Sequence, residues 1–272
     1  MRSFQRLDAK TPEQLRSMRA AGLVVAEALE QVQAAAAAGV TPVELDRLAE
    51  ATIRAAGAEP SFLGYQGYPA SICVSVGDVV VHGIPGSTPL REGDIVSVDC
   101  GAVLDGWHGD AAITFPIGEV DDAAAHLIEA TRASLWAGIV AMARGQRVGD
   151  IGVAVEAAVE AAGGNLGVLR DYVGHGIGRA MHTDPDVPNF ATRTAGPKLR
   201  PGATLAIEPM VVEGKFDTVV DPDDWTVRTA DGGRAAHWEH TVARTETGIC
   251  VLTAKDAGAA GLAPHNLIPT PL

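Results

Sequence analysis

The feature of this sequence that most constrains its fold is an internal repeat. The segment Gly39–Gly57 aligns with Gly145–Gly163 without a gap, and both have the composition of alanine-rich helices. Further along, the tripeptide HGI occurs twice, and so does an LRxG run followed by an apolar strand that ends in an acid, Asp99 or Glu208. This succession predicts two halves related by an approximate twofold axis. Each half is expected to contribute a pair of helices and a set of antiparallel strands.

Two apolar strands of the first half each carry one carboxylate. Asp99 lies in the run 94–100 and Asp110 in the run 108–115, and the connection between them contains Asp-Gly, which favours a tight turn. Burying a lone carboxylate costs free energy unless something cationic compensates its charge. The pair therefore indicates either a metal site or two surface acids on an edge hairpin, and the hairpin alone does not decide between them.

The repeat favours the metal site. Glu208 occupies the place that matches Asp99, and Glu239 is a second acid in an apolar strand of the second half. Together with Asp110 and with His175, which lies between two glycines, these acids would converge on the seam between the halves. Neighbouring carboxylates repel each other unless divalent cations or raised pKa values compensate. One imidazole among several carboxylates suits a pair of ions such as Mn²⁺, Fe²⁺, Co²⁺ or Zn²⁺.

Local patterns predict the elements around this seam. Helices are expected at 11–38, 41–57, 121–143 and 150–162, the first two with capping boxes. Strands are expected at 71–76, 78–82, 94–100, 108–115, 169–173, 204–212, 225–229, 236–244 and 249–252. The chain beyond Ala257 is rich in Ala, Gly and Pro and is expected to be loosely held.

Composition argues against several classes of protein. The formal net charge of −13, with no basic run to offset it, argues against nucleic-acid binding. No apolar run is long enough to cross a bilayer, and the first residues lack the apolar core of a signal peptide, so no membrane partner is expected. The 3 cysteines are widely spaced and form no CxxC pair, which indicates reduced thiols in a cytoplasmic protein.

Together these motifs resemble the type I methionine aminopeptidases of the creatinase/aminopeptidase superfamily, peptidase family M24, whose fold is called pita-bread. The resemblance runs from about Lys10 to Leu252 and rests on VVVHGIP, DIVSVDCG, GWHGDAAITF, YVGHGIGRAMH, LAIEPM, DDWTVRT and WEHTV. It implies an α+β fold in one catalytic domain over residues 1–272, with halves at about 11–118 and 119–255. Glu239 follows Glu208 by only 31 positions, which leaves no room for the type II insertion, and no zinc-finger extension is expected before the domain.

The resemblance also implies a role for each candidate residue. Two metal ions would be held by Asp99, Asp110, His175, Glu208 and Glu239. A water between the metals would attack the scissile carbonyl, and Glu208 would relay its proton. His182 would stabilise the tetrahedral oxyanion, and His82 would lie near the scissile amide. The alternatives are a surface loop histidine for His182 and a buried structural histidine for His82. The slot for the methionine side chain would be lined by Tyr65, Tyr68, Cys73, Met181 and Trp225.

The function that follows is removal of the initiator methionine from nascent polypeptides when the second residue is small. A monomer is expected, with the ribosome as a candidate partner. Two alternatives are a peptidase of the prolidase type, which cleaves Xaa-Pro bonds, and a non-catalytic pita-bread binding protein. The composition of the side-chain slot and the lack of an additional N-terminal domain argue against the first. The complete set of metal ligands argues against the second.

Overall fold

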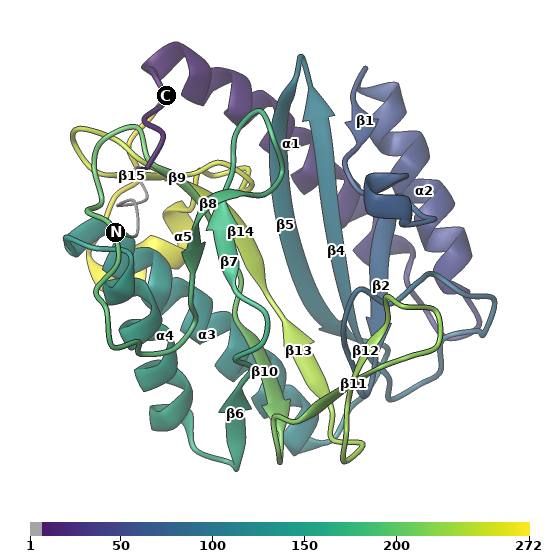
Figure 1. The fold of residues 1–272 in the computed structure, drawn as a ribbon. Helices are drawn as coiled ribbons and strands as arrows, with labels where there is room; N and C mark the ends of the chain where they lie inside the picture. The colour runs from purple at the N-terminus through teal and green to yellow at the C-terminus, as the bar shows by residue number, and fades with distance from the viewer. Residues whose placement is uncertain (1–6) are drawn as a thin grey trace.

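The structure is a computed structural model that describes residues 7–272. Figure 1 shows a curled antiparallel sheet in front of helices that cover one of its faces. The sheet has 9 strands in the order β1-β4-β5-β14-β9-β7-β8, with β2 on β4 and β15 on β14. These strands are β1 (Glu59–Pro60), β2 (Ile72–Val76), β4 (Ile95–Leu104), β5 (Trp107–Pro116), β7 (Gly174–Gly176), β8 (Thr183–Val187), β9 (Thr204–Ile207), β14 (Glu239–Arg244) and β15 (Ile249–Val251).

Two smaller sheets of 3 strands each continue this layer, in the orders β13-β10-β6 and β11-β12-β3. Their strands are β3 (Val79–Val81), β6 (Leu166–Val168), β10 (Met210–Glu213), β11 (Thr218–Val220), β12 (Val227–Thr229) and β13 (Ala235–His237). Short helical turns are η1 (Tyr65–Gly67), α5 (Ala259–Leu262) and η2 (Ala263–His265). No helix in the part of the chain that the structure describes is both long and apolar enough to cross a membrane.

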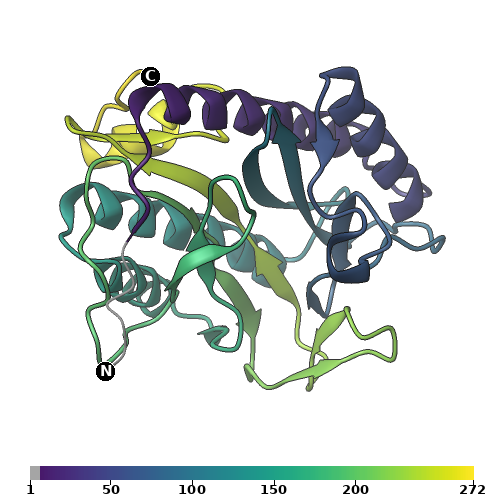
Figure 2. The same ribbon diagram turned by 45° about the horizontal axis from the view of Figure 1, so that its top comes forward.

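The long helices form two pairs, as the repeat predicted: α1 (Pro12–Ala35) with α2 (Pro42–Ala55), and α3 (Asp122–Arg144) with α4 (Gly149–Ala162). Figure 2 shows α1 running along the strands of the first half, while α3 lies behind those of the second. Capping residues start the first two helices. The Thr11 hydroxyl accepts from the Gln14 N–H and the Gln14 side chain accepts from the Thr11 N–H, whereas at the second helix the Glu44 carboxylate accepts from the N–H and the hydroxyl of Thr41. The centre of the large sheet, β4-β5-β14-β9, joins one strand pair from each half.

The predicted end of the first helix was wrong. The helix stops at Ala35 instead of continuing through residue 38, and Ala36 already has extended backbone angles. The chain then turns so that the Gly39 N–H donates to the Leu90 carbonyl at 2.8 Å. This tertiary hydrogen bond overrides the high helix propensity of the alanines.

Three predicted strands were wrong in their bounds. Residues 169–173 form no strand, because the pairing of β6 with β10 ends at Val168 and the chain bends before β7. The predicted strand 204–212 breaks at Glu208 and Pro209, since a proline has no N–H to donate to a neighbouring strand. The predicted strand 236–244 breaks at Trp238. At the last two breaks the chain passes between the large sheet and a small one.

The tail beyond Ala257 is not loosely held throughout. It forms α5, and the Leu262 side chain is completely buried in the core beneath α3. A Cβ atom added at Gly261 would lie 2.2 Å from the Trp136 ring, so the absence of a side chain there allows close packing. Near the end of the chain, the Thr270 N–H donates to the Ile249 carbonyl at 2.7 Å. The small residues that suggested a loose tail are those that let it dock.

Helix α1 crosses strand β5 at a contact between two glycines, which yields a first prediction. A Cβ atom at Gly109 would lie 2.7 Å from the Gly22 Cα, a main-chain atom that cannot rotate away. The substitution Gly109→Ala should therefore lower the free energy of unfolding by about 1–3 kcal/mol, measured by urea unfolding. The control is Gly86→Ala, at an exposed glycine with no atom within 4 Å. Equal stability of the two variants would contradict this packing.

Candidate metal centre

Strand register places three of the acids on one face of the large sheet. Asp99 of β4 and Glu239 of β14 pair with the same residue of β5, Ala112, from opposite sides. Directly opposed residues of a sheet share a face, and so do residues two apart on one strand, so Asp110 joins them. The alternate residues, such as Val98, pack on the other face against α1 and α2. Because side chains alternate between the two faces of a strand, the same pattern that buries the apolar residues against the helices places the carboxylates on the opposite face.

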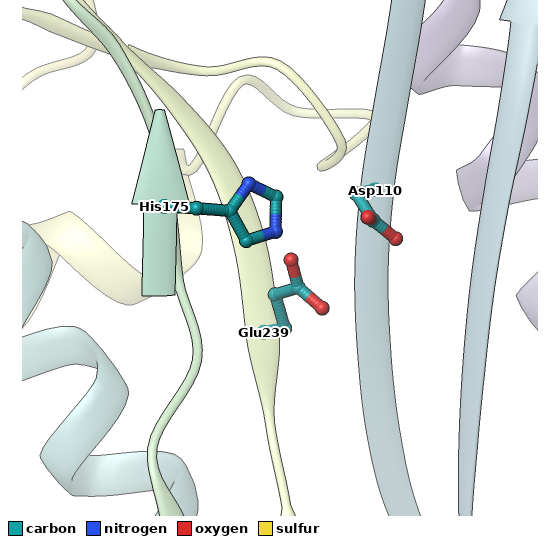
Figure 3. Close-up of side chains that lie close together, drawn as sticks. All are labelled: Asp110, His175 and Glu239. Atoms are coloured by element: carbon teal, nitrogen blue, oxygen red, sulfur yellow. The ribbon is translucent and has the colours of Figure 1, made fainter. Parts of the chain in front are cut away.

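The second half adds an imidazole and a further carboxylate. His175 on β7 pairs with β9, and Glu208 follows directly after β9. The His175 Nδ1 donates to the Gly176 carbonyl at 2.9 Å, so its Nε2 lone pair is available, and Nε2 lies 3.4 Å from Glu208 Oε1. Figure 3 shows His175, Asp110 and Glu239 converging from three strands. One donor atom from each of these three lies within 4.8 Å of the others.

The electrostatics of this group fit a bound cation. Asp99 Oδ1, Asp110 Oδ1 and Glu239 Oε1 are buried without a hydrogen-bond partner among the described residues. Burial raises the pKa of Asp99 to about 7, and burial together with neighbouring carboxylates raises the pKa values of Asp110, Glu208 and Glu239 well above the usual range. Burial lowers the pKa of His175 to about 4, so its imidazole is neutral. Orphaned carboxylate oxygens beside a neutral imidazole are the donors that a divalent cation takes.

The structure brings all of the sequence-predicted site residues to one cavity of about 420 Å³. They are Tyr65, Tyr68, Cys73, His82, Asp99, Asp110, His175, Met181, His182, Glu208, Trp225 and Glu239. Phe62 and Gln66 also line it. Neither is among the residues that the resemblance implies. The aromatic cluster that contains Phe62, at residues 60–68, by itself indicates either a substrate pocket wall or core filling beneath a loop. The acids and His175 form one end of the cavity, and the aromatic residues form the other.

The aromatic end is a slot for an apolar group. Phe62, Tyr68, Cys73 and Met181 form one buried cluster, and Trp225 packs edge-on against Tyr68 with ring centroids 5.1 Å apart. The Tyr68 hydroxyl shares its single proton between two backbone carbonyls, those of Ile72 at 3.2 Å and Gly83 at 3.1 Å. Burial raises the pKa of the Cys73 thiol, which keeps it neutral. The slot therefore has polarisable, uncharged walls.

Two further imidazoles line the cavity beside the acids. His182 packs against His175 with ring centroids 4.2 Å apart, and its Nδ1 lies 2.9 Å from the Tyr65 hydroxyl. His82 has a positive φ of 59° and packs edge-on against Tyr172. Burial lowers the pKa of His182 and lowers that of His82 to about 4. Both rings are therefore neutral near pH 7, and each can donate one hydrogen bond to a substrate.

The sequence analysis missed one histidine at this site. His237, at the end of β13, is 2% exposed, and its Nε2 lies 3.8 Å from Glu208 Oε2 and 4.0 Å from Glu239 Oε2. Glu208, His237 and Glu239 form a second group of potential ligands. Its position two residues before Glu239 was the available signal. That signal was weak, because the break in the strand at Trp238 could not be foreseen.

Comparison with known proteins places this arrangement among relatives. The model of metallopeptidase family M24 matches residues 16–246. Methionine aminopeptidase 1 of Mycobacterium tuberculosis is 57% identical over 245 residues, covering 88% of this chain and 92% of that protein. Methionine aminopeptidase 1 of Bacillus subtilis is 46% identical over 244 residues, which cover 90% of this chain and 98% of that protein. The crystal structure of the Thermotoga maritima methionine aminopeptidase superposes with a TM-score of 0.89 at 43% sequence identity. The match covers 92% of this chain and 100% of that one. The predicted pita-bread fold is confirmed.

The raised carboxyl pKa values predict how the stability of the metal-free protein depends on pH. Burial raises the pKa of Asp99 from 3.8 to about 7, so between these values the folded protein keeps a proton that the unfolded chain has released. Below about pH 6.5 the buried histidines with lowered pKa values, such as His82 and His175, have the opposite effect, because the unfolded chain protonates them and the folded protein does not. Above that pH the free energy of unfolding should therefore fall as pH rises, by about 1.4 kcal/mol per pH unit for each retained proton. Thermal unfolding of chelator-treated protein measures this.

Cations that bind the ionised carboxylates should restore the stability that the metal-free protein loses as pH rises. Added Mn²⁺ or Co²⁺ is expected to raise Tm more at about pH 7.5 than at about pH 5, because at the lower pH protons compete for the same oxygens. Mg²⁺-free buffer with K⁺ at equal ionic strength is the control. If the metal-free Tm rose with pH above about 6.5, where the histidines are neutral in both states, the four carboxylates would not be the groups that retain the protons.

Proposed function

This chain belongs to metallopeptidase family M24, and on that premise we propose that the cavity is an active site that holds two divalent cations. The residues proposed to hold them are Asp99, Asp110, His175, Glu208 and Glu239. The observation that carries the proposal is the set of buried, unpartnered carboxylate oxygens beside a neutral imidazole. Cobalt, manganese, iron and zinc ions all accept such oxygen and nitrogen donors.

The activity is that of a methionine aminopeptidase, a metal-dependent hydrolase that removes an N-terminal methionine from a peptide. The relatives that match this chain from nearly end to end carry that activity in their names. The slot between Tyr68, Cys73 and Met181 is apolar and polarisable, and a thioether side chain suits such walls. A peptidase for Xaa-Pro bonds has no comparable support from these residues.

The catalytic steps assigned to this chain concern binding and proton transfer. Cations held by these residues would neutralise the carboxylates and lower the pKa of a water bound to them. We assign to Glu208 the acceptance of the proton from the attacking water, because its carboxylate lines the cavity beside His175. His182 donates a hydrogen bond to the scissile carbonyl as its oxygen gains charge. His82 lies on the same cavity and donates toward the amide of the bond that breaks.

Tyr65 gives His182 the correct tautomer for this role. If the Tyr65 hydroxyl donates to His182 Nδ1, across the 2.9 Å that separates them, the ring proton must reside on Nε2. The Nε2–H can then donate to the substrate, whereas the other tautomer would present a lone pair to the oxyanion. Tyr65 is thus proposed as a positioning residue as well as a wall of the slot.

The finer assignments follow from the family resemblance. We propose that the substrates are nascent chains with a small second residue, that the ribosome is a candidate partner, and that the protein is a cytoplasmic monomer. Cys73, Cys100 and Cys250 are all free and buried, in keeping with a reducing compartment. The two halves, at about 11–118 and 119–255, are proposed to act as one catalytic domain because each supplies ligands to one centre.

The substrate assignment is tested by comparing peptides. With added Mn²⁺ or Co²⁺, the protein should release methionine from Met-Gly-Met and leave an Xaa-Pro peptide uncut. Replacing the proton acceptor, Glu208→Gln, should lower kcat by about 10²–10⁴-fold. The fold should persist, because a neutral amide replaces a buried charge. Glu246→Gln, at an exposed acid, is the matched control and should retain full activity. An uncut Met peptide under every metal would refute the proposed activity.

The tautomer assignment predicts a selective effect of Tyr65→Phe. Loss of one hydrogen bond should lower kcat by about 3–10-fold, while KM changes less than about 2-fold because the ring still lines the slot. In a His182→Ala background the same substitution should have no further effect on kcat, since the ring it orients is gone. Steady-state kinetics on Met-Gly-Met measure both. Additive losses in the double variant would show that Tyr65 acts independently of His182.

A further inference from the structure

His237 is fixed in place by its own backbone. Its N–H donates to the Thr114 hydroxyl at 2.9 Å and to the Ser97 hydroxyl at 3.2 Å, and its carbonyl accepts from Thr114 at 2.7 Å. It also pairs with Met210 across β10 and β13. These contacts fix the main chain at His237, and the burial of the residue restricts the ring. The chain enters the large sheet just after it, so His237 stands where the two sheets meet.

The imidazole of His237 has a buried nitrogen with nothing to bond to. Its Nε2 is without a hydrogen-bond partner among residues 7–272, and the nearest carboxylate atoms are Glu208 Oε2 at 3.8 Å and Glu239 Oε2 at 4.0 Å. Leaving a buried polar atom unpaired costs free energy, because the atom has lost its hydrogen bonds to water. Both separations are too long for a hydrogen bond. An imidazole held this rigidly beside two acids therefore lacks a partner of another kind.

The spacing fits a cation. An ion with nitrogen and oxygen ligands at about 2.1 Å holds those atoms about 3–4 Å from one another, depending on the angle between them. The separations of 3.8 and 4.0 Å lie within that range. A second cavity of about 130 Å³, lined by Asp99, Glu208 and His237 among others, adjoins the ring, so there is room beside it.

We propose that His237 is an additional metal ligand, whose Nε2 forms a second donor set with Glu208 and Glu239. This set shares Glu239 with the first set, Asp110, His175 and Glu239, so that each of two ions receives one imidazole. The proposal rests on the proposed metal centre and adds a ligand that the resemblance did not include. A second nitrogen donor shifts the preference of the site toward Zn²⁺, Fe²⁺ and Co²⁺ and away from Mn²⁺.

The experiment is X-ray absorption spectroscopy on the full chain loaded with Co²⁺, together with calorimetric titration of Co²⁺ into metal-free protein. The variant is His237→Gln, which keeps a side chain able to form hydrogen bonds but removes the imidazole. The control is His126→Gln, which removes an exposed imidazole on α3. The wild type should show about one imidazole per ion, and His237→Gln about half as many. The variant should also weaken one binding step by more than about 100-fold, beyond what an outer hydrogen-bond partner usually contributes.

An unchanged imidazole count in His237→Gln overturns the proposal. If affinity nevertheless falls by about 10–100-fold, His237 is instead a hydrogen-bond partner that holds Glu208. Should the variant not fold, nitrogen-15 NMR of histidine-labelled wild type with Zn²⁺ gives the answer, because two histidine rings must acquire metal-bound nitrogens. One such ring refutes the ligand. Wild type that binds no Co²⁺ would refute the metal centre itself, whereas cleavage of Met-Gly-Met with one bound imidazole leaves the proposed function standing.

Discussion

The mutual repulsion of buried carboxylates is the constraint on which this structure depends. Asp99, Asp110, Glu208 and Glu239 come from four places in the chain, and burial raises the pKa of each. Without protons or cations, the strands that carry them would be driven apart. The large hydrophobic clusters beneath the sheet offset that repulsion and hold the acids in a fixed geometry. Packing of the core therefore holds the four carboxylates close together, although their mutual repulsion is unfavourable until cations neutralise them.

The irregular points of the sheet are where the site is built. A continuous strand alternates its side chains between two faces, so it could supply an acid only at every second residue. The breaks at Pro209 and Trp238 release the chain from this alternation and let it pass between sheets. The Trp238 N–H donates to the Pro209 carbonyl at 3.3 Å, so the two breaks lie side by side. Glu208 and His237 reach the centre from these breaks, and Glu239 begins the strand that follows.

Sequence alone predicted the parts of this structure that obey a local rule. The capping boxes at Thr11 and Thr41 marked helix starts, and the repeat matched Asp99 with Glu208. What it could not supply were the consequences of contacts between distant segments. The end of α1 at Ala35 depends on a hydrogen bond to Leu90, and the role proposed for His237 depends on where its strand breaks. Such features are set by which surfaces meet, and a single sequence carries no direct record of that.

The contact of α1 with the rest of the molecule has a consequence for synthesis. A Cβ atom at Gly22 would lie 2.4 Å from the Leu252 carbonyl oxygen, so a helix near the start of the chain packs directly on a segment near its end. Contacts between such distant segments form slowly and only after both have been made. We expect the ribosome to have finished nearly the whole polypeptide before α1 can complete its packing, because the segment at Leu252 is made almost last.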